Sequence, residues 1–201
     1  MIRDKEMHRE LIVQTAFALF EEKGYDPVSI SEICKTAGVS RTVFYNSFSG
    51  KEEIFEEVLR DASKERLAAV DAFMEAPSDY ERIFALADQQ QSVPLTLGPR
   101  LASVLLRLDL ENKVDVWGVS HTIESWLVRL TANCQQQGII RNDASPERLT
   151  SVCIDICLQV LVQWCKQDGA FSLRAKTREC METIFMTAPE YCLSAEELRK
   201  L

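Results

Sequence analysis

The stretch from Lys35 to Phe55, KTAGVSRTVFYNSFSGKEEIF, contains several side chains that can make directional hydrogen bonds. An arginine such as Arg41 can pair with two acceptors of guanine, and an asparagine such as Asn46 can pair with adenine. The hydroxyl of Tyr45 and the ammonium of Lys51 suit phosphate oxygens. This chemistry fits contact with a nucleic acid. Because any small helix exposes polar residues, composition alone leaves that interpretation and a merely solvated surface both open.

The charge of the chain is unevenly distributed. The formal net charge is −8, which argues against a generally basic, nonspecific nucleic-acid binder. Between Ser29 and Lys51, however, Lys35, Arg41 and Lys51 outnumber the single carboxylate Glu32, so this window carries +2. A polyanion would therefore meet the chain through this small basic region.

Helical patterns surround these residues and would position them. A first amphipathic helix ends at Gly24, a residue type that commonly terminates helices. In SISE, Ser29 can cap a second short helix while Glu32 reaches back to it, and that helix ends at Gly38. Ser40 then caps a third helix, which we expect over Arg41 to about Phe48. The motif SGKE, with the cap pair Ser49 and Glu52, opens a long fourth helix. Two short helices joined by a tight glycine turn form a helix-turn-helix, whose second helix enters the major groove of DNA.

The run FALFEEKGYDPVSISEICKTAGVSRTVFYNSFSGKEEIF resembles the N-terminal domain of the TetR family of bacterial transcriptional regulators. The resemblance implies an all-α fold with a helix-turn-helix DNA-binding domain over residues 1–50, a linking helix over 51–75, and a ligand-binding and dimerisation domain over 76–201. Thr42 and the pair Asn46 and Ser47 depart from the residues common in the family, which affects the DNA sequence that is read and leaves the fold unchanged. The DNA-binding residues implied by the resemblance are Ser29, Ser31, Arg41, Thr42, Val43, Tyr45, Asn46, Ser47 and Lys51. Tyr45 and Lys51 would hold phosphates, and Ser29 would mainly cap its helix.

The rest of the chain has helical patterns throughout. We expect helices over roughly 79–91, 97–110, 113–137, 146–167 and 173–187, with Ser78 and Glu81 as a capping pair. Pro94 and Pro99 should bend the chain between the first two of these helices. The motif SAEE could cap a short helix near the C-terminus.

Two apolar helices near the C-terminus would form the interface of a homodimer. The helix predicted over 146–167 is apolar on most sides, and its polar stripe consists of Asp155, Gln159 and Gln163. The family resemblance implies that this helix and the next form a four-helix interface with their copies. The expected interface residues are Cys157, Leu161, Trp164, Thr177, Met181, Ile184 and Phe185. Burial of the same residues inside a monomer is the alternative.

A small-molecule effector is the second expected partner. A largely apolar pocket with a polar anchor would suit the residues that follow one helical face near Trp117 and His121. The candidate ligand-binding residues are Phe84, Arg100, Leu101, Val104, Trp117, His121, Ser125 and Val128. We expect a repressor that binds an inverted-repeat operator in double-stranded DNA as a homodimer and is released by this effector.

Two other functions compete with this one. A thiol-responsive regulator on the same scaffold could use Cys153 and Cys157, which lie one helical turn apart. An enzyme has less support, because the chain has only two histidines, His8 and His121, and no recognisable nucleophile motif. We expect no metal site, no cofactor and no membrane partner, and a location in the cytoplasm, since the seven cysteines are scattered rather than spaced as a secreted framework.

Overall fold

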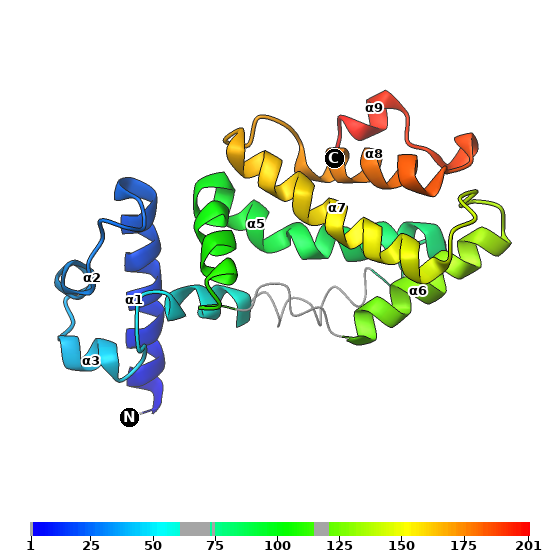
Figure 1. Ribbon diagram of the computed structural model, residues 1–201. Coiled ribbons are helices and arrows are strands. Elements are labelled where there is room, and N and C mark those ends of the chain that lie inside the picture. Colours follow the sequence, from blue (N-terminus) through cyan, green and yellow to red (C-terminus); the bar gives the residue numbers. More distant parts are fainter. Residues whose placement is uncertain (1, 61–72, 74, 115–120) are drawn as a thin grey trace. The chain divides into compact units, whose positions relative to one another are not determined.

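The computed structural model describes residues 2–60, 73, 75–114 and 121–201. Every regular element in these residues is a helix (Figure 1), so the all-α prediction is confirmed. The chain divides into two compact units, of which unit 1 comprises residues 1–63 and 100–117 and unit 2 comprises 64–99 and 118–201. The segment 100–117, which we expected in the C-terminal domain, therefore groups with the N-terminal helices.

Unit 1 contains α1 (Ile2–Lys23), α2 (Ile30–Ala37), α3 (Arg41–Tyr45) and a helical segment over 53–60. Its core is aromatic. The rings of Phe20 and Phe55 stack with centroids 6.0 Å apart, and Tyr25 and Phe17 pack against them at their edges. The end of α1 before Gly24 and the start of α3 after Ser40 are as predicted, but α3 is shorter than expected and ends at Tyr45.

The predicted cap pairs in unit 1 were only partly right. Ser29 accepts from the backbone N–H of Glu32 as expected, but the carboxylate of Glu32 pairs with Lys23, at 2.7 Å, and does not complete a capping box. Ser49 bonds through its hydroxyl to Glu53 rather than to Glu52, at 2.8 Å. The Ser29 signal identified the start of α2 correctly, whereas the fourth helical segment begins at residue 53, later than a cap at Ser49 implies.

The helix α5 (Asp79–Leu110) connects the two units. It begins at the Ser78 cap, which accepts from the N–H of Glu81, and it is interrupted at Gly98, whose φ of 73° and ψ of 165° are not helical. The break lies directly before Pro99, as a bend at this proline predicts, but the residues around Pro94, where we expected a gap between two helices, are helical. Residues 79–99 belong to unit 2 and residues 100–110 to unit 1.

Unit 2 also contains α6 (His121–Gln136), α7 (Pro146–Lys166), α8 (Leu173–Phe185), the 3-10 helix η1 (Pro189–Tyr191) and α9 (Ala195–Leu198). The expected helix over 113–137 is described from His121 onward, and residues 111–114 form turns. α7 packs against both α6 and α8. The tail helix α9 has the predicted Ser194 cap, here as a full capping box with Glu197. The core cluster of this unit includes Tyr80, Ile83, Phe84, Leu130, Cys134, Ile140, Met181 and Phe185.

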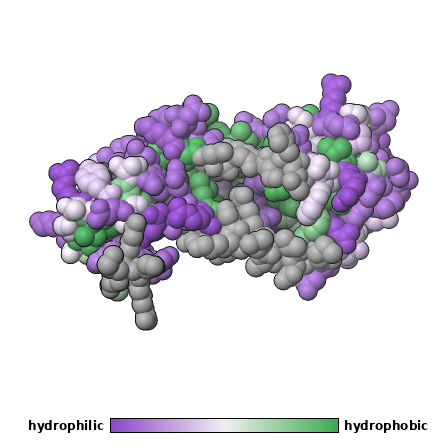
Figure 2. Space-filling model, turned by 90° about the horizontal axis from the view of Figure 1, so that it is seen from below, coloured by the Kyte–Doolittle hydropathy of each residue, from purple (hydrophilic) through white to green (hydrophobic). Residues whose placement is uncertain are grey.

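α7 is long and apolar enough to cross a membrane by length and composition alone. The same test is passed by core helices of soluble proteins, and α7 lies between α6 and α8 with Asp155, Gln159 and Gln163 exposed, as the sequence predicted. The described part of the face drawn in Figure 2 is largely hydrophilic, with small hydrophobic areas between the polar ones.

Candidate DNA-binding surface

The turn between α2 and α3 is built on one left-handed residue. Gly38 has φ of 68°, and its N–H donates to the carbonyls of Cys34 and Lys35. A glycine is favoured here because residues with a Cβ rarely adopt this conformation. Val39 then donates to the carbonyl of Cys34 at 3.0 Å, and Ser40 accepts from the N–H of Val43 at 3.2 Å. α3 therefore starts immediately after α2, with the direction fixed by this turn.

Helix α3 is anchored by one face and exposed on the other. Phe44 is fully buried and its ring packs against that of Phe48, which is also buried. Arg41, Thr42 and Asn46 are exposed, and Val43 is half-buried. Tyr45 is 49% exposed, so its hydroxyl lies on the same surface as Arg41 and Asn46.

Arg41 and Tyr45 form a pair on this exposed face. The Nη2 of Arg41 donates to the Tyr45 hydroxyl at 3.5 Å, and the guanidinium carbon lies 5.9 Å from the ring centroid. The two residues are one helical turn apart, which is the spacing that brings side chains together. Because Arg41 is exposed, its other N–H donors are accessible to the oxygens of a polyanion.

Ser47, one of the DNA contacts implied by the family resemblance, is buried. It is only 8% exposed, and its carbonyl accepts from Nη1 of Arg9 at 2.6 Å. Arg9 also donates through Nε to Glu57 at 2.6 Å and lies over the ring of Phe48. Helix α3 ends before this residue, so Ser47 does not continue the exposed face of the helix and is buried instead. The role of Arg9 could not be predicted, because no local motif marks it.

The remaining predicted DNA contacts occupy two different environments. Ser29 is exposed and caps α2, while Ser31 is exposed in the first turn of that helix. Lys51, in contrast, points back to the turn after α1: its Nζ donates to the carbonyls of Tyr25, Asp26 and Val28 at 2.7, 3.2 and 3.0 Å. The ammonium of Lys51 therefore already has acceptors within the chain. Its contact with phosphate stays a prediction.

The predicted effector residues are divided between the two units. Phe84, Ser125 and Val128 belong to unit 2, where Phe84 is buried, whereas Arg100, Leu101 and Val104 belong to unit 1. Trp117 and the side chain of His121 lie outside the described residues. The pocket therefore stays a prediction. Among the described residues, no group of three histidine, cysteine or acidic side chains could hold a metal ion.

Most of the predicted interface residues are buried within the chain itself. Leu161, Thr177, Met181 and Phe185 are at most 2% exposed, and Trp164 is 6% exposed, so these side chains have almost no surface left for a second chain. Cys157 and Ile184 are half-buried. The exposed apolar residues of the same region are Val152, Leu158 and Met186. The sequence showed that α7 is apolar on most sides, but only its packing between α6 and α8 shows which side stays open.

Comparisons with known proteins match this architecture. Residues 12–58 match the family model described as bacterial regulatory proteins, tetR family. The chain is 37% identical over 68 residues to the transposon Tn10 TetC protein of Escherichia coli, covering 34% of this chain and 32% of that protein. It is 31% identical over 52 residues to IcaR of Staphylococcus aureus, a negative transcriptional regulator of the biofilm operon icaADBC, covering 26% and 28%. The chain spans about half or less of the length of the curated relatives it matches.

Solved structures extend the likeness over both units. The TetR family transcriptional regulator PfmR from Thermus thermophilus aligns with a TM-score of 0.61 at 22% identity, covering 88% of this chain and 97% of that one. The regulator FadR from Bacillus subtilis, solved in complex with stearoyl-CoA, aligns with a TM-score of 0.62 at 18% identity, covering 88% and 97%. At these identities the alignments show a shared fold. Residues 12–58 therefore form an N-terminal domain of the tetR family of bacterial regulatory proteins, in a chain that shares the fold of TetR family regulators.

Proposed function

We propose that this regulator is a cytoplasmic repressor that binds an inverted-repeat operator as a homodimer and is released by a small molecule. The main support is the exposed face of α3, which is anchored by buried Phe44. This face carries Arg41, Thr42 and Tyr45, and Asn46 follows at the end of the helix. A helix held in this way can enter the major groove without losing its packing.

The chemistry of these side chains suits specific recognition. Arg41 would pair with the O6 and N7 acceptors of a guanine, and Asn46 with the N6 and N7 groups of an adenine. Thr42 and half-buried Val43 would contact thymine methyl groups or the nearby backbone, and Tyr45 would donate its hydroxyl to a phosphate. Ser29 and Ser31, at the start of α2, would approach the adjacent backbone.

The homodimer would place two reading helices in successive major grooves. A two-fold dimer binds half-sites about 34 Å apart or a small multiple of that distance, so the operator should be an inverted repeat. The open side of α7 and the end of α8 support an interface there. Val152 and Met186 line a groove of about 410 Å³ between these helices, together with Asn142, Ala144, Arg148, Leu149, Thr183 and Ile184.

Release by an effector would follow from linkage. A small molecule that binds better to the chain in its DNA-free state lowers operator affinity by that difference, and DNA lowers effector affinity by the same factor. FadR from Bacillus subtilis was solved with stearoyl-CoA, so long-chain acyl-CoA is the first class of effector to test. The candidate ligand residues in unit 2 and unit 1 are the positions to substitute.

A selection experiment tests the proposal. The purified chain is incubated with a library of random-sequence duplexes, and bound duplexes are amplified and sequenced over several rounds. We expect enrichment of an inverted repeat, and partial loss of binding when stearoyl-CoA is added. Enrichment of no sequence would contradict DNA recognition, while an enriched repeat that stearoyl-CoA leaves bound would reject that effector alone.

The thiol-responsive alternative has little support from the two cysteines that suggested it. Cys153 is buried, and burial raises the pKa of both Cys153 and Cys157 to about 12. Because the thiolate is the reactive form, these thiols should react slowly at neutral pH.

A further inference from the structure

The turn that joins α1 to α2 is held by contacts with the half-buried Lys51. Tyr25 and Val28 in this turn are buried, and the carbonyl groups of residues 25, 26 and 28 converge on the Nζ of Lys51. The same Nζ lies 4.1 Å from the centroid of the Tyr25 ring, within the range of a cation–π contact. One ammonium group thus joins the start of the fourth helical segment to the turn before α2.

The hydrogen-bonding capacity of Lys51 is used up by these contacts. A lysine ammonium has three N–H donors, and three carbonyl oxygens lie within 3.2 Å of it. Burial also lowers the pKa of Lys51, as expected for a cation partly removed from water. A phosphate oxygen could bind this group only by displacing a backbone carbonyl of the turn.

A second cation reaches the same turn from a distant part of the chain. Arg107, in the segment 100–110 of α5, donates through Nη2 to the Asp26 carboxylate at 2.8 Å. Its guanidinium carbon lies 5.7 Å from the centroid of the Tyr25 ring. Tyr25 therefore contacts both Lys51 and Arg107, and the turn is fixed to two other segments of unit 1.

The position of this turn determines where the reading helix lies. Ser29, which caps α2, follows the turn directly, and the Gly38 turn then fixes α3 relative to α2. A shift of residues 25–28 would therefore move α2 and α3 together. A small misplacement of recognition groups weakens contacts that depend on hydrogen-bond geometry.

We propose that Lys51 and Arg107 are positioning residues that hold the Tyr25–Val28 turn and thereby place α2 and α3 for DNA, and that Lys51 does not bind phosphate. This inference rests on the proposed DNA binding. It replaces the phosphate contact that the family resemblance implied for Lys51.

The salt dependence of DNA binding separates the two roles of Lys51. Loss of one phosphate contact reduces the slope of log affinity against log salt concentration by about 0.9, whereas loss of a positioning contact leaves the slope unchanged. We would measure the affinity of the full chain for the duplex selected by the wild type over a series of salt concentrations. The variants are Lys51→Met, Arg107→Met and, as a matched control for loss of an exposed cation in α2, Lys35→Met.

We expect Lys51→Met and Arg107→Met to lower affinity about tenfold with the wild-type slope, and to speed amide hydrogen exchange in α2. A slope reduced by about 0.9 per subunit in Lys51→Met, with normal exchange in α2, would overturn the inference. Should Lys51→Met fail to fold, Arg107→Met decides, since wild-type affinity and exchange in that variant would also overturn it. If the wild type selects no duplex at all, the proposed function fails instead.

Discussion

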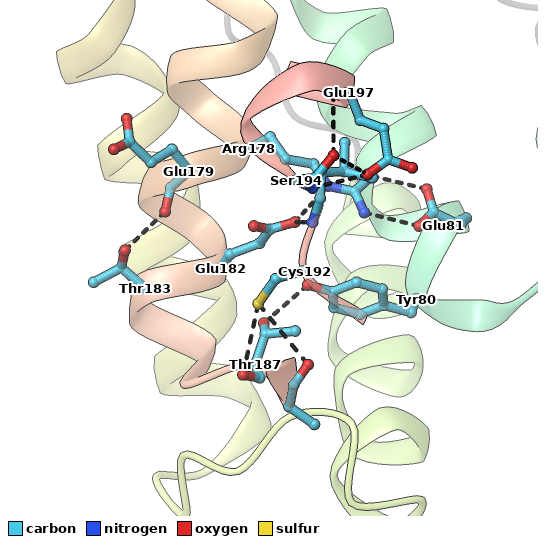
Figure 3. Close-up of polar contacts among 12 residues, drawn as sticks. Tyr80, Glu81, Arg178, Glu179, Glu182, Thr183, Thr187, Cys192, Ser194 and Glu197 are labelled. Carbon is cyan, nitrogen blue, oxygen red and sulfur yellow. Dashed lines mark hydrogen bonds and ion pairs between the residues drawn. The ribbon is translucent and has the colours of Figure 1, made fainter. Parts of the chain in front are cut away.

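Arg178 of α8 donates two hydrogen bonds of 2.8 Å each to the carboxylate of Glu81 at the start of α5 (Figure 3). Its Nε donates to Glu182, also at 2.8 Å, and its guanidinium carbon lies 3.8 Å from the centroid of the Phe84 ring. Glu182 in turn accepts from the backbone N–H of Leu193 in the tail. This buried arginine therefore joins α5, α8 and the C-terminal tail of unit 2.

Replacing Arg178 with methionine should destabilise unit 2 strongly. The substitution leaves the carboxylate of Glu182, 8% exposed, without its cation, and breaking a buried ion pair in this way costs roughly 3 kcal/mol or more. Urea unfolding measures the loss. The control is Lys200→Met, which removes an exposed ion pair with Glu196 and should change stability by less than about 0.5 kcal/mol. Equal effects of the two substitutions would show that the network contributes no more than a surface pair.

Asp79 should make stability depend on acid pH. Hydrogen bonds from Asn133, at 2.8 Å, and from Arg82, at 2.7 Å, lower the pKa of Asp79 in the folded chain. Its contribution is present above the unfolded-state pKa of about 3.9, and it is lost as the pH falls through the lower folded-state pKa. Urea unfolding from about pH 6 to about pH 3 should thus show a shallower loss of stability in Asp79→Asn than in the wild type. If Asp79→Asn and the exposed control Asp143→Asn alter the dependence of stability on pH equally, Asp79 does not contribute this acid sensitivity.

Substitutions on two sides of α7 should separate folding from dimerisation. Leu158 is 39% exposed and Leu161 is 2% exposed. Leu158→Glu should yield a folded monomer, because it places a charge in the proposed interface, whereas Leu161→Glu should unfold unit 2, because it buries a charge in the core. Sedimentation gives the oligomeric state and circular dichroism the helix content. A Leu158→Glu chain that remains dimeric would place the interface elsewhere.

Cysteine reactivity should follow burial. At neutral pH, iodoacetamide should modify exposed Cys192 before Cys153 and Cys157, since burial raises the pKa of those two thiols to about 12. Mass spectrometry of the native chain identifies the modified residues over time. Rapid modification of Cys153 or Cys157, with DNA binding lost at the same rate, would instead revive the thiol-responsive alternative.

Local signals in the sequence predicted the DNA-binding helices well. Gly24 and Gly38 end helices, and Ser29 and Ser40 cap them, because each of these roles depends on a few adjacent residues. The contacts between distant residues could not be predicted in this way. Arg107 and Asp26 are 81 positions apart, and no periodic pattern relates them.

The sequence also could not predict which side chains of unit 2 are buried. The helix predicted over 146–167 is apolar on most sides, so its pattern does not distinguish a side that faces α6 or α8 from one that faces another chain. The structure assigns Leu161 to the core and leaves Leu158 exposed. On α3, the predicted contacts Arg41 and Tyr45 are exposed, but the prediction for Ser47 was wrong, because Ser47 lies beyond the end of that helix and is buried.

If the exposed face of α3 reads DNA sequence, the base preference of the chain should change in Arg41→Ala. We would measure the affinities of the wild type, Arg41→Ala and the charge-matched control Arg199→Ala for the selected duplex and for each of its single-base-pair variants. Arg41→Ala should lose roughly 1 to 3 kcal/mol of binding free energy and its preference at one base pair of each half-site, because a bidentate contact with guanine contributes about that much. Arg199→Ala should keep the wild-type preferences. An Arg41→Ala chain with wild-type affinity and unchanged preference at every position would contradict the account.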